Sequence, residues 1–186
     1  IAALIVTAIT RGMSGLKEWA GRMFRWRFGW KWYGIALLAY PLVTTTAYTI
    51  SDLFQGRTEW SVLTMWRAGF ANVQTNAIRI GIDPQDTAQI LVVLIIATLL
   101  VILFEEGGWR AFAIPHMQEC LSPLASGVVM GGIWSLWHLP AFFTVGSDQY
   151  GMPFTWFFIT ILSVSILMVW MMNHANQSAL ITILFH

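Results

Sequence analysis

The sequence predicts an all-α, polytopic membrane protein with about six or more transmembrane helices, of which the terminal ones are incomplete. Composition is the first reason: of 186 residues, 57% are hydrophobic, 15% are aromatic and only 10% are charged. A soluble domain carries about 25% charged residues, so an ordinary soluble protein is excluded. The second reason is that apolar residues form runs close to the roughly 20 residues that a bilayer-spanning helix needs. No repeat or linker divides the chain, which predicts a single helical domain over residues 1–186.

The first third of the chain contains two apolar runs with a basic segment between them. Residues 1–9 are predicted to be the tail of a membrane helix, and residues 33–54 a second span that contains Pro41. The segment 11–32 interleaves aromatic residues with six of the ten basic residues, which is typical of an interfacial segment on the cytoplasmic side. The alternative is a nucleic-acid or substrate-binding patch; we expect membrane lipid and no nucleic acid as partners. The six basic residues are Arg11, Lys17, Arg22, Arg25, Arg27 and Lys31.

The rest of the chain alternates polar connections with apolar runs. Residues 55–86 form the only long polar stretch, with a turn predicted at Gly81, Asp83 and Pro84, on the opposite side of the membrane. Because the chain opens with Ile and stops inside an apolar segment, we expect both ends to be cut and further helices to lie beyond them. No cleavable signal peptide is evident. The predicted spans are 87–104, 122–143 and 152–172, followed by a polar connection at 173–177 and a partial helix at 178–186.

Two adjacent carboxylates, Glu105 and Glu106, follow the most apolar run of the chain. An ionised group inside a membrane helix costs about 2.5–3.5 kcal/mol on insertion scales, so intramembrane acids are functional candidates. On a helix, Glu106 pairs with Arg110 four residues later, whereas Glu105 is rotated by about 100° and points elsewhere. One paired and one unpaired carboxylate can take different roles. The alternative is an ion pair at the membrane surface that caps a span.

A second candidate region carries His138. Gly127, Gly131, Trp134 and His138 follow three- and four-residue spacing and share one helix face, where the small residues let another helix approach closely. If the chain turns at residues 121–122, His138 and Glu105 lie at similar distances from that turn and therefore at similar depth.

An unbroken helix over residues 87–120 would be about 51 Å long, well beyond the roughly 30 Å hydrocarbon core. A break is therefore predicted at Gly107–Gly108 or at Pro115. A third candidate, His186, lies on the last apolar segment with Ser178 and Thr182 on its face.

These three motifs resemble those of the CPBP (CAAX protease and bacteriocin-processing, or Abi) family of intramembrane glutamic endopeptidases, in particular its bacterial branch, which is related to type II CAAX prenyl proteases. That family carries E-E-x-x-x-R, then F/W-x-x-x-H, then H-x-x-x-N. Here they read Glu105-Glu106-Gly-Gly-Trp-Arg110, Trp134-Ser-Leu-Trp-His138 and His186. The resemblance departs at two places: the Asn expected after His186 lies beyond the chain end, and Ala111 stands where Gly is common.

The resemblance implies an enzyme whose catalytic helices lie within residues 87–186. Glu105 would be the general base that activates a water, with His138 at hydrogen-bond distance, and His186 would stabilise the oxyanion. Glu106, Arg110 and Trp134 would support the site structurally. The substrate would be a membrane-delivered peptide, either a CAAX-type lipidated C-terminus or a leader peptide, and no cofactor would be needed. We expect a multi-pass protein of the cell membrane.

Two other functions stay open. Two His and a Glu can bind zinc with an open position for water, which would make the chain a zinc-dependent intramembrane protease that a chelator inactivates. The spacing is not H-E-x-x-H, and the single cysteine, Cys120, gives neither a metal framework nor an internal disulfide. The other alternative is a non-catalytic bacteriocin immunity or scaffold protein. A transporter is disfavoured because we find no internal repeat.

Overall fold

The structure, a computed structural model, describes residues 1–56, 67, 71, 75, 78, 81–83 and 85–186. The predicted polar connection at 55–86 therefore lies largely outside the described residues, as do Arg57, Arg79 and Pro84 within it. Gly81 is described and lies in a turn with φ of 80°, which agrees with the predicted turn. No β-strand occurs among the described residues, so the all-α class is confirmed.

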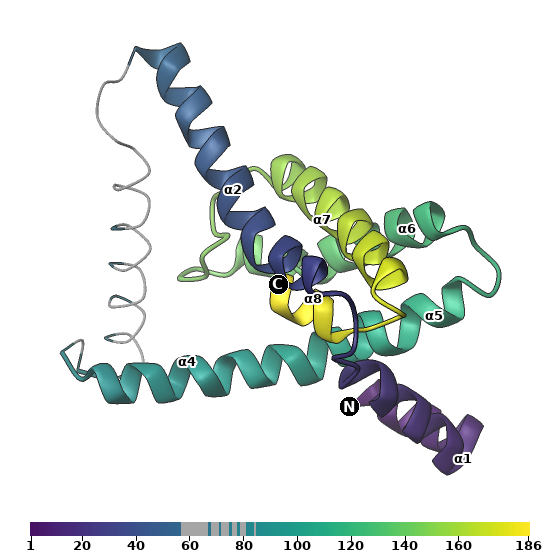
Figure 1. Cartoon of the computed structure of the whole chain (residues 1–186). Coiled ribbons are helices and arrows are strands. Elements are labelled where there is room, and N and C mark those ends of the chain that lie inside the picture. Colours follow the sequence, from purple (N-terminus) through teal and green to yellow (C-terminus); the bar gives the residue numbers. More distant parts are fainter. Residues whose placement is uncertain (57–66, 68–70, 72–74, 76–77, 79–80, 84) are drawn as a thin grey trace. The chain divides into compact units, whose positions relative to one another are not determined.

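The chain divides into two compact units. Unit 1 comprises Ile1–Ala36 and Ile102–His186 and holds every predicted site residue, whereas unit 2 comprises Leu37–Val101. The prediction of one membrane domain over the whole chain stays a prediction. The α-helices (Figure 1) are α1 (Ala2–Met23), α2 (Trp30–Gln55), α4 (Thr87–Val101), α5 (Ile114–Met117), α6 (Pro123–Trp137), α7 (Phe154–His174) and α8 (Leu180–Phe185). The described residues also form two π-helical segments, η1 (Ile102–Glu106) and η2 (Trp109–Ala113), and one 3₁₀ segment, η3 (Leu139–Phe143).

Two described helices are long and apolar enough to cross a membrane, Trp30–Phe54 and Phe154–His174, and a shorter apolar helix covers Thr87–Ala97. In α2, threonine hydroxyls donate to the carbonyls four residues earlier, for example Thr46 to Leu42 at 2.7 Å. Such bonds satisfy hydroxyl groups within an apolar environment. The count of six or more spans stays a prediction.

The predicted span at 122–143 is not one helix. Helix α6 ends at Trp137 after 15 residues, and the chain continues as the 3₁₀ segment η3. Pro140 explains the end, because proline has no N–H to donate and its ring clashes with the carbonyl four residues earlier. His138 is therefore the C-terminal cap of α6 and does not lie in the middle of a span.

The basic segment 11–32 comprises the second half of helix α1, the loop after it and the start of α2, and its interfacial position stays a prediction. The α1 element runs through residue 23 with non-helical backbone at Gly12 (φ 57°), and residues 24–29 form a loop that leads into α2. The inner face of α1 carries Trp19, whose indole donates to the Gly107 carbonyl at 2.8 Å. Helix α1 thus packs against the segment that carries Glu105 and Glu106.

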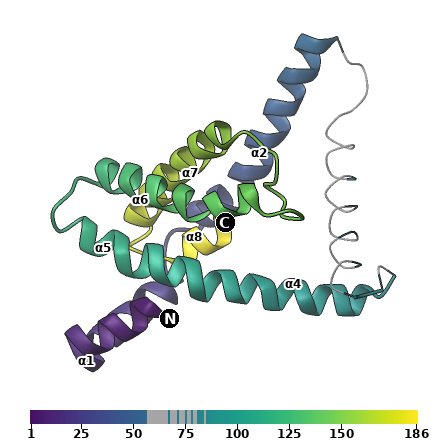
Figure 2. The ribbon, with the colours of Figure 1, turned by 180° about the vertical axis from the view of Figure 1, so that it is seen from behind.

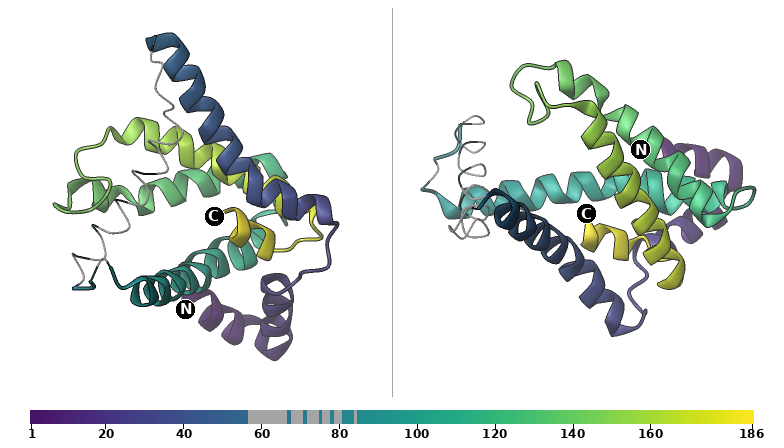
Figure 3. Two further views of the ribbon diagram at one scale, coloured as in Figure 1. Left: turned by 60° about the vertical axis from the view of Figure 1, so that its left-hand side comes forward. Right: turned by 90° about the horizontal axis from the view of Figure 1, so that it is seen from above.

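Helices α6 and α7 pack side by side and antiparallel in all the views (Figure 1, Figure 2, Figure 3). Their close approach depends on two glycines of α6, as the sequence predicted. A Cβ atom at Gly127 would lie 3.0 Å from the Ile166 Cα, and one at Gly131 would lie 2.8 Å from the Leu162 Cα. Gly132, by contrast, has open space around its Cα.

This contrast gives a test of the packing. We expect Gly131→Ala to destabilise the protein by about 1–3 kcal/mol, because the added methyl group meets backbone that must shift. Gly132→Ala serves as the control and should be neutral or stabilise by up to about 1 kcal/mol, since alanine favours a helix. Thermal unfolding of the two variants in detergent measures both effects; equal behaviour would contradict the close packing of α6 on α7.

Candidate active site

The two glutamates lie on a helical segment that changes its winding. The prediction of a break at Gly107–Gly108 is wrong, because the helix continues through both glycines and instead widens into two π-helical segments, η1 and η2, on either side of them. Insertions of π-helix are frequent at functional sites. At Pro115, the second predicted break point, the helix also continues. Proline cannot donate to the carbonyl of Ala111, and the Arg22 guanidinium of α1 donates to that carbonyl instead, at 3.2 Å.

Glu106 is fully buried and has a partner for each carboxylate oxygen. Arg110 Nη1 donates to Oε1 at 2.9 Å, so the structure contains the predicted ion pair, in which both side chains are 0% exposed. His186 Nδ1 lies 2.8 Å from the same oxygen, and the Thr182 hydroxyl donates to Oε2 at 2.8 Å. A buried charge is tolerated only when it is paired and hydrogen-bonded, and Glu106 meets both conditions.

Sequence reasoning missed the role of Thr182. It placed Thr182 on the same face as His186, but the contact of Thr182 with Glu106 could not be inferred without the position of α8. Helix α8 contacts both α7 and η1 (Figure 3), and through Thr182 and His186 it is attached to Glu106 by two hydrogen bonds. Glu106, which belongs to the first motif, therefore binds the helix that carries His186 of the third motif.

Arg110 is held from three sides. Besides its bond to Glu106, its Nη2 donates to the Met168 sulfur at 2.9 Å, and its guanidinium carbon lies 4.2 Å from the centre of the Trp134 ring. A guanidinium over an indole face gains cation–π attraction, which is strongest where water is excluded. These contacts fix the charge that neutralises Glu106.

Glu105 has a different environment from its neighbour. It is half-buried, and its Oε2 accepts one hydrogen bond, from the Trp134 indole N–H at 3.0 Å. No other hydrogen bond to its carboxylate occurs among the described residues. Glu105 can therefore accept further hydrogen bonds, whereas both carboxylate oxygens of Glu106 already have partners.

His138 lies close to the glutamates through Trp134. Its Nδ1 is 3.0 Å from the Trp134 carbonyl oxygen, and the His138 and Trp134 ring centres are 6.1 Å apart. A carbonyl can only accept, so Nδ1 carries the proton and a neutral ring keeps its lone pair on Nε2. The expected hydrogen bond from His138 to Glu105 does not occur among the described contacts; Trp134 bonds to both residues instead. The reason is that His138, as the cap of α6, turns Nδ1 back onto its own helix.

His186 completes the cluster. Its ring meets the Trp134 ring edge-on at 5.3 Å between centres, and its side chain is 27% exposed. With Nδ1 facing the Glu106 carboxylate, Nε2 is free to face a substrate. All six predicted site residues therefore lie in one cluster in unit 1, with Trp134 in contact with Glu105, Arg110, His138 and His186.

The side chains of this cluster also bear on metal binding. Within the part of the chain that the structure describes, no group of three or more His, Cys, Asp or Glu side chains is arranged to hold a metal ion. In this cluster Glu106 has both oxygens engaged by Arg110, Thr182 and His186. The arrangement offers a carboxylate and two imidazole nitrogens, which suits acid–base chemistry on a water molecule.

Comparison with known proteins gives a consistent result. The model of the family "Type II CAAX prenyl endopeptidase Rce1-like" matches residues 87–186, which contain the whole cluster. The CAAX prenyl protease 2 of Methanococcus maripaludis is 36% identical over 94 residues, covering 47% of this chain and 35% of the relative. The match thus spans about a third of the length of that curated relative. Because the family model covers more than half of the chain, the chain belongs to the Rce1-like family of type II CAAX prenyl endopeptidases.

Proposed function

We propose that this protein is an intramembrane endopeptidase in which Glu105 activates a water molecule to cleave a membrane-delivered peptide. One observation carries the proposal: two adjacent carboxylates have opposite environments. Glu106 is buried, charge-paired and fully hydrogen-bonded, whereas Glu105 is half-buried and accepts a single hydrogen bond. Glu106 is therefore suited to a structural role, and Glu105 is suited to accepting a proton.

The proposed reaction uses the open acceptor positions of Glu105 and His138. A water molecule bound to Glu105 gives up a proton to the carboxylate as its oxygen attacks the scissile carbonyl carbon. His138 Nε2 accepts a second hydrogen bond from that water and orients it. The resulting tetrahedral intermediate collapses when the C–N bond breaks, and protonated Glu105 returns its proton to the leaving amine. Trp134 fixes Glu105 by its indole N–H and fixes His138 by its carbonyl.

His186 is proposed to stabilise the oxyanion of the intermediate. Its Nδ1 is anchored on the Glu106 carboxylate, which leaves Nε2 to face the substrate, and in the imidazolium form the Nε2–H would donate to the oxyanion. In the family motif this role is shared with an Asn four positions later. Glu106 would then act on the reaction through His186, while the Glu106–Arg110 pair holds the helix in place.

The substrate and the membrane setting are part of the same proposal. The family description and the name of the relative point to peptides with a prenylated CAAX terminus, and a leader peptide is the second candidate of the same class. We propose a multi-pass protein of the cell membrane with six or more spans. Its basic segment 11–32 would face the cytoplasm, following the positive-inside rule.

The proposal is tested with the full-length protein in proteoliposomes and fluorogenic peptides that differ only in prenylation. We expect cleavage of the prenylated peptide and the same rate with and without a chelator. Loss of cleavage with the chelator and recovery on adding zinc would replace the glutamate-activated water with zinc chemistry. A folded protein that cleaves no peptide, prenylated or not, would favour an immunity or scaffold role.

A further inference from the structure

The loop between α1 and α2, together with the first residue of α2, exposes large aromatic side chains next to several cations. Phe24 is 68% exposed, Trp26 61% and Trp30 86%, while Trp19 and Trp32 on either side are buried. Exposed indoles beside Arg and Lys are typical of groups that lie at the polar boundary of a bilayer. This feature is not used by the proposed catalytic cluster.

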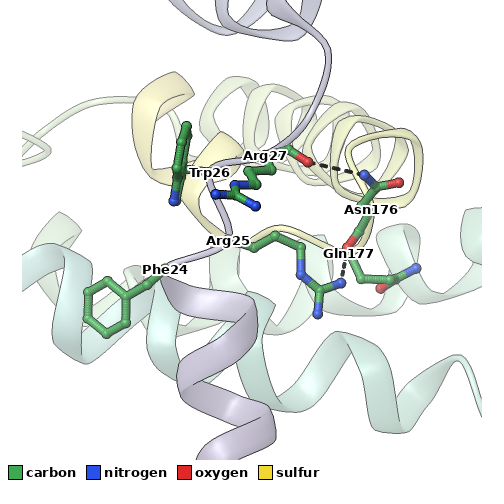
Figure 4. Close-up of a pocket in the computed structure, with 6 residues that line it drawn as sticks. All are labelled: Phe24, Arg25, Trp26, Arg27, Asn176 and Gln177. Atoms are coloured by element: carbon green, nitrogen blue, oxygen red, sulfur yellow. Dashed lines mark hydrogen bonds between the residues drawn. The ribbon is translucent and has the colours of Figure 1, made fainter.

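The loop forms one wall of an open hollow of about 760 Å³. The other wall is the turn between α7 and α8; in Figure 4 the Arg25 side chain reaches this turn, whereas the Arg27 guanidinium lies on the Trp26 side of the hollow. Arg25 donates to the Asn176 carbonyl, and Arg27 stacks over Trp26 at 5.0 Å. The residues that line the hollow are Phe24, Arg25, Trp26, Arg27, Asn176 and Gln177.

The positive charge of this hollow is not neutralised. Among the described residues, no Asp or Glu forms an ion pair with Arg25, Arg27 or Lys31, whereas Arg11 and Arg22 on α1 both pair with Glu18. An arginine fork matches the paired oxygens of a phosphate group, and a stacked guanidinium still presents its N–H edge. The chemistry therefore favours an anion with phosphate oxygens and an apolar body beside it.

The same turn carries helix α8. The Ala179 N–H donates to the Arg22 carbonyl at 3.0 Å, and the Ser178 hydroxyl donates to the Arg25 carbonyl at 2.6 Å. Anything that fixes residues 22–27 therefore also fixes the start of α8, whose other end carries His186.

We propose that this hollow, defined by Arg25, Arg27 and the 176–177 turn, binds the headgroup of an anionic phospholipid, and that binding orders α8. The lipid phosphate lies between the two guanidinium groups, and Phe24, Trp26 and Trp30 insert beside its acyl chains. The site is separate from the reacting groups, and its occupancy is measurable without any peptide cleavage.

The binding test uses the full chain in a neutral detergent, titrated with dioctanoyl phosphatidylglycerol, dioctanoyl phosphatidylcholine or inorganic phosphate. We expect phosphatidylglycerol to raise the unfolding temperature and to bind at least about 10-fold more tightly than phosphatidylcholine. Arg25→Gln/Arg27→Gln should remove this preference. Arg11→Gln/Lys17→Gln removes the same amount of charge from the same basic segment and should retain it.

The second readout is hydrogen exchange of the α8 amides, which we expect to slow when phosphatidylglycerol is present, in the wild type but not in Arg25→Gln/Arg27→Gln. Equal binding of the anionic and the neutral lipid, or equal effects of the two double variants, would overturn the site. Inorganic phosphate that binds as tightly as phosphatidylglycerol would overturn the lipid assignment, and so would an acidic peptide or RNA that displaces the lipid. Lipid binding without slower exchange in α8 would overturn the coupling.

Discussion

Glu105→Gln is expected to abolish peptide cleavage while the protein stays folded. Glutamine has nearly the same shape, and its amide oxygen can still accept the Trp134 indole N–H that now binds Glu105 Oε2. An amide cannot take a proton from water, so the general base is lost, which typically lowers the rate by a factor of about 10²–10⁴. Cleavage of the prenylated fluorogenic peptide in proteoliposomes measures the rate, and thermal unfolding in detergent measures stability.

Asp148→Asn supplies the matched control. It is the same acid-to-amide change at an exposed carboxylate in the loop between η3 and α7. We expect unchanged turnover and unchanged unfolding temperature for this variant. Turnover retained in Glu105→Gln would remove Glu105 as the base, and turnover lost together with a large drop in unfolding temperature would assign Glu105 a structural role.

Local sequence patterns were sufficient where the interacting groups lie on one helix. Glu106 and Arg110 are four residues apart, and helical spacing alone predicted the ion pair, even though this stretch contains π-helical turns. The glycines of α6 were similarly predictable, because small residues on one face indicate a close neighbour. The comparison of depth between Glu105 and His138 assumed a turn at 121–122, and the structure has one there, with Ser122 and Pro123 as the cap and first residue of α6.

Contacts between distant segments could not be predicted in the same way. Thr182 reaches Glu106 across 76 positions, and Trp19 reaches Gly107 across 88. No local period encodes such pairings, because they depend on where α1 and α8 dock. Similarly, the effect of Pro140 was missed. Helix α6 ends at Trp137, and His138 at its cap has Nδ1 on the Trp134 carbonyl, so the direct bond to Glu105 that the family resemblance implied does not occur among the described contacts.

The buried ion pair carries the second prediction. Glu106→Ala and Arg110→Ala should each destabilise the protein by about 3–5 kcal/mol, because removing one partner leaves the other charge buried without compensation. The double variant should lose much less than the sum of the two single losses, since the two residues form one unit. Thermal unfolding or resistance to denaturing detergent, measured for the four proteins of this cycle, gives the coupling between the two residues.

Glu18→Ala is the control for this cycle, because Glu18 also pairs with an arginine four residues later but its side chain is 52% exposed. An exposed pair contributes about 0–1 kcal/mol, so this loss should be small. Additive losses in the cycle, or a large loss in only one of the two single variants, would show that the pairing is not what stabilises this segment. Glu106→Ala removes the bond to Thr182 as well as the ion pair. If it lowers the free energy of unfolding more than Arg110→Ala does, and the difference equals the effect of Thr182→Val alone, that difference measures how strongly α8 is attached. In that case Glu106 stabilises its own helix through Arg110 and holds the helix that carries His186 through Thr182.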